Sequence, residues 1–332
     1  MSSAAGSGSW LGLAGSAGLA AVAAWLLTAA LIPLLRRHML DQPNARSSHT
    51  NPTPRGGGAV FVLVAGLAWL WHGSWWLWWC LPLALVGLID DRRGLPVTWR
   101  YGVQVLTAGA LLLHPVLPGV SASWWVVPVV LIAATALINF TNFMDGLDGL
   151  VAGCMTLVFA AAALRGVPQL WPLVGALLGF LPWNWSPARV FMGDGGSTFL
   201  GAVLVAALLH SSSWGDALGL SLVALPLLAD ALSCVLRRAL AGQPVLQAHR
   251  LHLYQRLNQA GWSHGRVSGS YVAATAALAL MFLVGGWPVV LVGSAIVVWI
   301  GFRLDRSVAI PFGQAARLAQ AGLSLQSEQP RC

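Results

Sequence analysis

The chain has 332 residues, of which 57% are hydrophobic and only 8% are charged, and its mean hydropathy is +0.73. This composition excludes an ordinary soluble domain and a disordered chain, and it indicates an integral membrane protein along the whole length. The formal net charge of +8 comes from arginine alone, because the sequence contains no lysine.

Apolar stretches recur along the chain at lengths suited to crossing a bilayer. About 30 Å of hydrocarbon requires a helix of about 17–25 residues. We predict an all-α, polytopic membrane protein with about 11 transmembrane helices in one domain, residues 1–332. The predicted spans are 10–35, 57–72, 75–90, 101–117, 123–141, 147–165, 169–184, 197–213, 216–237, 268–285 and 286–304. The pairs within 57–90 and 268–304 have very short connections, so either pair is alternatively one bent or re-entrant element.

Arginine falls almost entirely in the loops after odd-numbered spans, beginning with Arg36 and Arg37, and Arg165 is the exception. The positive-inside rule therefore places these loops and the C-terminus in the cytoplasm and the N-terminus outside. The uncharged leader MSSAAGSGS indicates an N-out anchor instead of a cleaved signal peptide. The predicted cytoplasmic loops are approximately 36–56, 90–100, 141–147, 184–197 and 237–267.

Aspartates abut several of these apolar runs, where a carboxylate costs roughly 2.5–3.5 kcal/mol on insertion scales. Asp90 and Asp91 close the third span, Asp145 and Asp148 follow the fifth, and Asp194 follows the seventh. The predicted topology, derived from arginine alone, brings all five to the cytoplasmic face. The sequence thus predicts a single site there.

The first acidic pair lies in the segment LIDDRRGLP. Asp90 and Asp91 are about 100° apart on a regular helix, so the pair suits a helix end. Adjacent carboxylates repel unless a cation lies between them, and a divalent metal or the following Arg92 and Arg93 would complement them. A plain helix end beside topogenic arginines explains the segment equally well.

The second acidic pair lies in NFTNFMDGLDGL, where Asp145 and Asp148 share a helix face and Asn139 and Asn142 supply amides upstream. The two glycines allow a close approach to the backbone. An EF-hand is disfavoured because the chain runs on into an apolar span. The pattern favours a metal or phosphate site over a purely structural role.

In FMGDGGSTFLG, Asp194 lies in a glycine-rich turn that opens a helix. Free backbone N–H groups and the positive end of the helix dipole then face the same place as a carboxylate. Such oxygen ligands suit Mg²⁺. The alternative is a simple helix cap, a role also open to Ser197.

Two further loops carry groups suited to phosphates. The loop 237–267 includes Arg250 and His252, and the first loop places Arg46, His49 and Arg55 beside three glycines. The first loop has no Walker pattern, which argues against nucleotide hydrolysis. Asp230, inside the ninth span, is either a site residue or a helix–helix hydrogen-bond partner.

Five segments occur in a familiar order: DQPNARSSHTNPTPRGGG, LIDDRRGLP, NFTNFMDGLDGL, FMGDGGSTFLG and AHRLHLYQRL. From about residue 41 to 257 the chain resembles the polyprenyl-phosphate N-acetylhexosamine-1-phosphate transferases, an integral membrane family that includes the peptidoglycan translocase and the initiators of O-antigen synthesis. The resemblance implies transfer of a sugar 1-phosphate from a UDP-N-acetylhexosamine to undecaprenyl phosphate, with release of UMP. It also implies a requirement for Mg²⁺, with Mn²⁺ as the alternative ion.

The resemblance assigns expected roles to individual residues. Asp90, Asp91, Asp145 and Asp148 are the expected catalytic group, in which Asp90 or Asp91 orients or deprotonates the lipid phosphate. Asp194, with Asp91, is the expected metal ligand, and a covalent phospho-aspartate route stays open. The expected substrate-binding residues are Arg46, His49, Arg55, Asn139, Asn142, Asn184, Gly193, Arg250 and His252.

The resemblance further implies a bacterial inner-membrane protein with a periplasmic N-terminus and a site on the cytoplasmic face, with a homodimer common in the family and no nucleic-acid partner. Relatives in the peptidoglycan branch carry consecutive histidines in the last loop. Here His252 is followed by Leu253, Tyr254 and Gln255. The chain therefore resembles the O-antigen-initiating branch, which accepts UDP-N-acetylglucosamine or deoxy relatives such as UDP-N-acetylfucosamine and UDP-N-acetylquinovosamine.

Two other classes of membrane protein are the alternatives to this resemblance. A transporter or channel with a basic cytoplasmic mouth also contains intramembrane acids, but it scatters them through the midplane and often shows an internal repeat. The CDP-alcohol phosphotransferases gather their aspartates in one continuous helix-borne signature. In this chain the aspartates are spread over several loops, which favours neither class.

Overall fold

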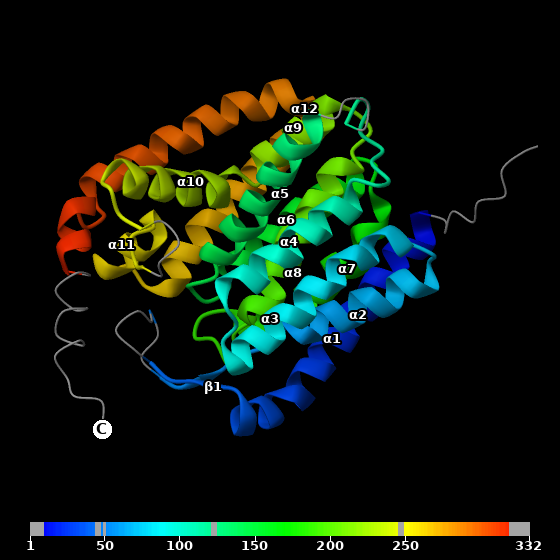
Figure 1. Cartoon of the computed structure of the whole chain (residues 1–332), viewed down its shortest axis with the longest axis horizontal. Coiled ribbons are helices and arrows are strands. Elements are labelled where there is room, and N and C mark those ends of the chain that lie inside the picture. The colour runs from blue at the N-terminus through cyan, green and yellow to red at the C-terminus, as the bar shows by residue number, and fades with distance from the viewer. Residues whose placement is uncertain (1–9, 44–47, 49–50, 121–124, 245–248, 319–332) are drawn as a thin grey trace, which may run out of the picture.

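The computed structural model describes residues 10–43, 48, 51–120, 125–244 and 249–318, and these residues are largely helical (Figure 1). The α-helices are α1 (Trp10–His38), α2 (Gly58–Trp71), α3 (Leu81–Arg93), α4 (Val97–Leu111), α5 (Val126–Phe143), α6 (Leu150–Leu164), α7 (Trp171–Asn184), α8 (Gly193–Leu209), α9 (Trp214–Val223), α10 (Leu225–Leu240), α11 (Leu253–Gln259) and α12 (His264–Ser307). Short 3-10 helices, η1 (Trp75–Cys80) and η2 (Pro168–Leu170), precede α3 and α7.

Three helical segments are long and apolar enough to cross a membrane: Gly15–His38, Val126–Phe143 and His264–Ser307. The bent pair α9 and α10 forms a fourth if it is one span, and α2, α6 and α8 are shorter apolar helices. The described residues therefore agree with the prediction of an all-α membrane protein. The count of about 11 spans and their orientation stay predictions.

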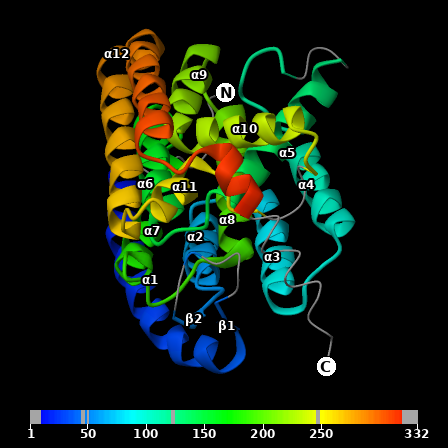
Figure 2. The same ribbon diagram turned by 90° about the vertical axis from the view of Figure 1, so that its left-hand side faces the viewer.

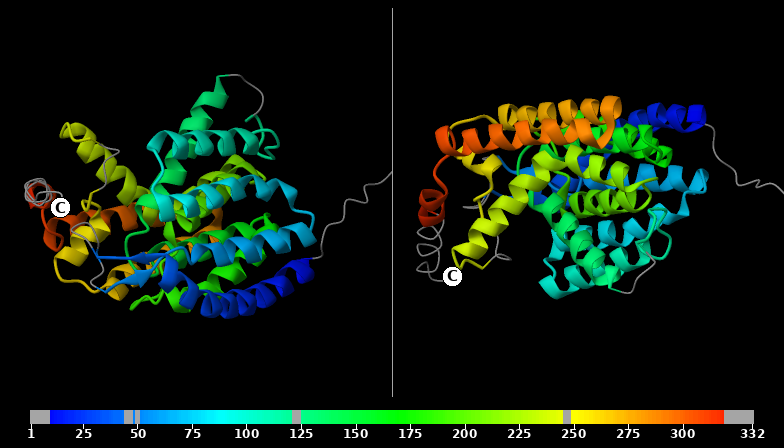
Figure 3. Two further views of the ribbon diagram at one scale, coloured as in Figure 1. Left: turned by 60° about the horizontal axis from the view of Figure 1, so that its bottom comes forward. Right: turned by 90° about the horizontal axis from the view of Figure 1, so that it is seen from above.

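Prolines and glycines mark the interruptions of the helices. The axis bends by 75° between α9 and α10. Pro226 lies just after this break, and proline removes a helical N–H and clashes with the carbonyl four residues earlier. Gly286, at φ +67°, interrupts α12, whose two arms lie side by side in Figures 2 and 3. The predicted pair 268–285 and 286–304 corresponds to these two arms, which are separate helices on either side of Gly286, and the pair within 57–90 forms two helices joined by η1.

The core of the protein lies around α6 and α8, whose side chains are buried on nearly all sides. Helices that are apolar all round belong at the centre of a bundle. Against α8 pack α3 and α5, and against α6 pack α7 and α12, while α1 covers the outside of α7 (Figure 2). The N-terminus of α8 is therefore held from several directions.

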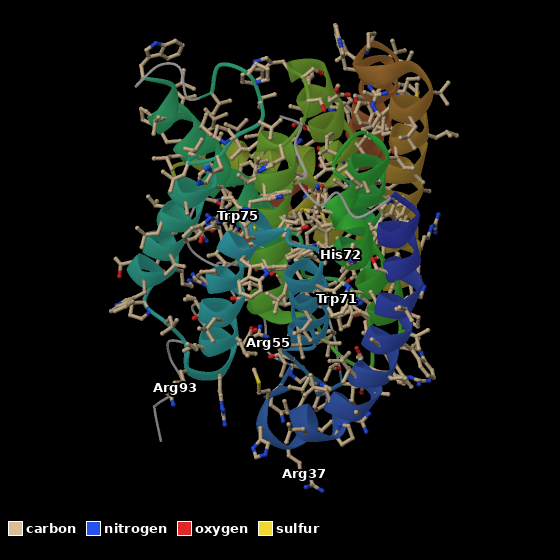
Figure 4. All side chains as sticks on the ribbon, turned by 90° about the vertical axis from the view of Figure 1, so that its right-hand side faces the viewer. Arg37, Arg55, Trp71, His72, Trp75 and Arg93 are labelled. Carbon is tan, nitrogen blue, oxygen red and sulfur yellow. The ribbon has the colours of Figure 1, made fainter. Side chains whose placement is uncertain are left out.

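A short antiparallel ribbon follows α1, formed by β1 (Leu40–Asp41) and β2 (Thr53–Pro54). The sequence analysis treated 36–56 as a loop and did not predict this ribbon. Figure 4 shows Arg37 and Arg93 at the same lower end of the molecule, below Trp71 and Trp75. The ribbon adjoins the end of α1. It returns the chain to the bundle, where α2 begins at Gly58.

Candidate functional site

The segment after the ribbon is tied to the start of α8. Phe191 N donates to Pro54 O over 2.8 Å, and Gly57 N donates to Phe191 O over 2.9 Å. Gly58 N in turn donates to Met192 O over 2.9 Å. These backbone bonds place Arg55 beside the first turn of α8.

The glycines of FMGDGGSTFLG allow helices to approach each other closely. A Cβ on Gly58 of α2 would lie 2.6 Å from the Cα of Gly196, and a Cβ on Gly87 of α3 would lie 2.5 Å from the Cα of Gly195. Neither separation is sterically possible, so both glycines are required. The N-terminus of α8 is consequently wedged between α2 and α3.

Asp91 at the end of α3 caps α8. Its Oδ1 accepts from Asp194 N over 3.0 Å, its Oδ2 accepts from Gly195 N over 3.3 Å, and Arg55 Nε lies 3.4 Å from Oδ1. The Asp91 side chain is fully buried. Free backbone N–H groups were predicted at this helix start, and in the structure two of them donate to Asp91, while Asp194 itself lies in the first turn of α8.

A cavity of about 240 Å³ opens beside this turn and is called the acidic cavity below. Four aspartates line it, against one arginine and one histidine. Its lining residues are Asp41, Ser48, Arg55, Asp145, Gly146, Leu147, Asp148, Asn184, Phe191, Gly193, Asp194, Gln255 and His264. The structure thus brings together the second and third acidic motifs, as the sequence predicted, and adds Asp41 from β1.

Asp145 faces the acidic cavity without a compensating partner, since its carboxylate makes no hydrogen bond or ion pair among the residues that the structure describes. Burial, together with the nearby carboxylates of Asp194 and Asp91, raises the pKa of Asp145 to about 8. A cation bound in the cavity would relieve this repulsion.

Asp194 lines both the acidic cavity and a smaller cavity next to it. In the smaller cavity, Arg100 Nη1 lies 2.9 Å from Asp90 Oδ2 and 3.7 Å from Asp194 Oδ2. Asp90 Oδ1 also accepts from Leu95 N over 2.5 Å. Arg100, which was not among the predicted site residues, is therefore the main positive group between Asp90 and Asp194.

The predicted amide residues lie at the two cavities. Asn139 and Asn142 line the smaller one: Asn139 exchanges hydrogen bonds with Gln104, of 2.7 and 3.3 Å, and Asn142 Oδ1 accepts from Ser197 Oγ over 2.7 Å. Asn184 lines the acidic cavity. Its Oδ1 accepts from Gly149 N, and its Nδ2 donates to Val190 O. These amides fix the walls of the site.

Asp148 ties three segments together at the acidic cavity. Its Oδ2 accepts from Ala188 N over 3.1 Å, and its Oδ1 lies 3.1 Å from His264 Nδ1. Burial raises the pKa of this carboxyl, but the hydrogen bond and the charge of His264 outweigh burial, so the pKa lies below its usual value. Asp148 is thus engaged in holding the wall, in contrast to Asp145.

Several lining residues were not among the predicted site residues. Gln255 and His264 belong to the segment in which Arg250 and His252 were predicted to bind substrate, yet the latter two do not line the acidic cavity. His252 Nδ1 instead lies 3.7 Å from Asp230 Oδ1. The predicted residues Arg46 and His49 lie outside the described residues.

The acidic cavity fits a hard divalent cation. Mg²⁺ prefers oxygen ligands and is commonly held by one or two carboxylates together with substrate phosphates. Asp145 and Asp194 supply such carboxylates on one cavity, whereas both oxygens of Asp91 accept from backbone N–H groups. These two side chains are the residues best placed to hold an ion.

Known proteins share sequence similarity with this chain. Residues 75–212 match the profile described as Glycosyl transferase family 4. This range includes α3, the loop 144–149 and the start of α8, and with them every predicted site aspartate, whereas Asp41 lies outside it.

Curated relatives extend the similarity over most of the chain. The decaprenyl-phosphate N-acetylglucosaminephosphotransferase of Mycobacterium tuberculosis is 31% identical, over 68% of this chain and 70% of the relative. The phospho-N-acetylmuramoyl-pentapeptide-transferase of Synechococcus sp. (strain JA-3-3Ab) is 32% identical, over 79% of this chain and 88% of the relative. The chain therefore belongs to the polyprenyl-phosphate N-acetylhexosamine-1-phosphate transferases of glycosyl transferase family 4.

Proposed function

We propose that the protein transfers an N-acetylhexosamine 1-phosphate from a UDP-sugar to undecaprenyl phosphate, with release of UMP. The acidic cavity carries this proposal: Asp145 and Asp194 face one space together with Arg55. Carboxylates and an arginine around one cavity suit a reaction between two phosphate-bearing substrates and a divalent cation.

In the proposed reaction, an oxygen of the prenyl phosphate attacks the β-phosphorus of the UDP-sugar. The bond from that phosphorus to the oxygen bridging the two phosphates breaks, and UMP leaves with the bridging oxygen and its electron pair. No base is strictly required, because the attacking phosphate is already anionic near neutral pH. The enzyme acts mainly by positioning the reactants and by compensating charge on the phosphoryl oxygens.

The residues of the site divide this work. Arg55, held against Asp91, offers its guanidinium group to a phosphate in the acidic cavity, and Arg100 offers a second positive group at the smaller cavity. Asp145 and Asp194 would hold Mg²⁺, which when bound supplies charge compensation for the diphosphate. His264 and Asp148 fix the opposite wall.

The test is UMP release by the purified protein supplied with undecaprenyl phosphate, Mg²⁺ and a panel of UDP-N-acetylhexosamines. Asp194→Asn is expected to lower the rate by roughly 10²–10³-fold, because it removes a carboxylate that would hold the cation needed to compensate transition-state charge. Asp216→Asn is the matched control, because Asp216 lies in α9 and pairs with Arg165 away from the cavity. Release that is unchanged in Asp194→Asn would refute the proposed site.

The donor and pathway are a finer part of the proposal. The absence of consecutive histidines after His252 supports initiation of O-antigen or a related surface polysaccharide. We expect UDP-N-acetylglucosamine or a deoxy relative to release UMP, and the pentapeptide-bearing donor of peptidoglycan synthesis to release none. Turnover of the latter donor would reassign the branch.

The location of the site is also proposed, at the cytoplasmic face of the bacterial inner membrane. Cysteines introduced singly at exposed positions such as Arg93 and Arg189 should react with a membrane-impermeant thiol reagent in inside-out vesicles only. The described cysteines Cys80, Cys154 and Cys234 are buried, and Cys332 is replaced by serine in every variant to remove its thiol. If only one of the two cysteines reacted in inside-out vesicles, positions 93 and 189 would face opposite compartments. A common site would then be ruled out.

A further inference from the structure

A buried aspartate outside the acidic cavity connects to it through α11. Asp230 lies in α10, and only 3% of its side chain is exposed. Its Oδ1 accepts from Leu253 N over 2.7 Å, and its Oδ2 accepts from Tyr254 N over 3.0 Å. Tyr271 Oη of α12 also donates to Oδ2, over 2.7 Å. One carboxylate therefore joins three helices.

The two backbone donors are the first N–H groups of α11, which have no partner within the helix itself. A buried carboxylate that accepts from both satisfies them and complements the positive end of the helix. In a helix of only seven residues, this anchor fixes both position and rotation, since isolated short helices are marginal. Figure 1 shows α11 next to α10.

The rotation of α11 determines where the side chains of Tyr254 and Gln255 lie. Tyr254 is buried, and its Oη donates to Phe143 O over 3.0 Å. A Cβ on Gly146 would collide with the same Oη, so the Tyr254 ring lies directly against the backbone of the loop 144–149. The next residue, Gln255, accepts from His252 N over 3.3 Å and lines the acidic cavity.

Phe143 and Gly146 flank Asp145, the cavity carboxylate without a compensating partner. The direction of the Asp145 side chain is therefore set by the backbone from Phe143 to Gly146. Tyr254 contacts this backbone at both ends. The two glycines of NFMDGLDGL were predicted to allow a close approach to the backbone, and at Gly146 the group that approaches is the Tyr254 side chain.

We propose that Asp230 is a positioning residue for the sugar-phosphate transfer, which acts through α11 by setting Tyr254 against the Asp145 loop and Gln255 in the cavity wall. This inference rests on the proposed function. It assigns no contact between Asp230 and substrate, because the carboxylate is enclosed by α10, α11 and α12.

Three variants separate positioning from general stability. Tyr254→Phe removes the bond to Phe143 O and keeps the ring. Asp230→Asn leaves one acceptor oxygen for two N–H groups. Tyr271→Phe removes an equally short bond to Asp230 but leaves both bonds to α11 in place, and it is the matched control.

We expect Tyr254→Phe and Asp230→Asn to lower kcat for UMP release roughly 5–10-fold, the rate equivalent of about one hydrogen bond. Both should raise the Mg²⁺ concentration for half-maximal rate, because the direction of Asp145 is less well fixed. Tyr271→Phe should change neither quantity, even where it lowers the Tm. Equal changes in kcat and Mg²⁺ dependence for Tyr254→Phe and Tyr271→Phe would overturn the inference.

Hydrogen exchange gives a readout that needs no turnover. Amides in the loop 144–149 should exchange faster in Tyr254→Phe and Asp230→Asn than in the wild type, and at the wild-type rate in Tyr271→Phe. Unchanged exchange in Tyr254→Phe would refute the link through α11, whatever the activity. Absent UMP release by the wild type from every donor would instead refute the proposed function, and the exchange result would still decide the link.

Discussion

Asp145 and Asp216 are both partly enclosed aspartates close to a helix end, yet their surroundings are opposite. Asp216 in α9 accepts from Arg165 Nη2 over 2.6 Å and from Ser213 Oγ over 2.7 Å. Asp145 has no such donor in the described part of the chain and lies near other carboxylates. One carboxylate is satisfied by the protein, and the other is left for something that the protein binds.

Whether the protein itself supplies donors to a carboxylate distinguishes structural from functional aspartates here. Burial does not, because Asp145 and Asp216 are both partly enclosed. The Asp216 network joins the end of α6 to the start of α9 and caps α9 through Ser213. The Asp145 arrangement lowers the stability of the folded protein, because burial and the nearby carboxylates of Asp194 and Asp91 oppose the charged form of Asp145. Such a cost is expected at a site that a cation or substrate completes.

The largest expected effect comes from Asp145→Asn. Loss of a carboxylate that would hold the charge-compensating cation should lower UMP release by roughly 10²–10³-fold. In the absence of divalent cations, the same substitution should raise the free energy of unfolding by about 1–3 kcal/mol, since it removes a buried ionisable group and its repulsion with Asp194 and Asp91. Activity assays and thermal melts in EDTA test both. A lower Tm together with lost activity would point to a folding defect instead.

The second prediction concerns added Mg²⁺. An ion that binds only the folded protein stabilises it by about 2.7 kcal/mol at 100 times its Kd. The Tm of the wild type should therefore rise with Mg²⁺ and return to its starting value with EDTA, while that of Asp145→Asn should rise much less. Asp216→Asn, the matched carboxylate control, should respond as the wild type does. Equal shifts in both variants would place the ion elsewhere.

Much of this site could be predicted from the sequence. Arginine distribution and apolar length together predicted Asp145, Asp148 and Asp194 at one face of the membrane. In the structure all three line the acidic cavity. This worked because residues at helix ends on the same side of a bundle have few alternative positions. Family motifs then supplied the chemistry.

The direction of individual side chains could not be predicted in the same way. Asp91 was predicted as a metal ligand, which stays a prediction, and its hydrogen bonds from the backbone of α8 become visible only once α3 and α8 are packed together. Gln255 and His264 are ordinary polar residues in the sequence, and their place at the cavity depends on the rotation of α11 and the start of α12. The directions of these side chains are set by tertiary contacts and not by the local sequence pattern.

The third prediction addresses the satisfied carboxylate. Asp216→Asn weakens hydrogen bonds to the Arg165 guanidinium group and to Ser213 Oγ at the start of α9. The expected loss is about 1 kcal/mol of unfolding free energy, because Arg165 is partly exposed and such pairs contribute little. The Tm should fall slightly, and UMP release per folded molecule should stay at the wild-type value. A tenfold loss of activity would contradict the comparison.

The smallest expected effect is the pH dependence that Asp148 contributes. Its pKa is lower in the folded protein than the usual carboxyl value of 3.8, since the favourable hydrogen bonds outweigh burial. A depressed pKa stabilises the folded state above the unfolded pKa, and this stabilisation is lost as the pH falls through the folded pKa. The Tm of the wild type minus that of Asp148→Asn should therefore shrink as the pH falls below about 4. Between about pH 7 and 5 the same difference should grow, because burial of His264 is outweighed by its hydrogen bond to Asp148, which raises the pKa of His264. A difference that kept growing below about pH 4 would mean that Asp148 is destabilised in the fold, like Asp145, and would place it with the carboxylates that await a cation.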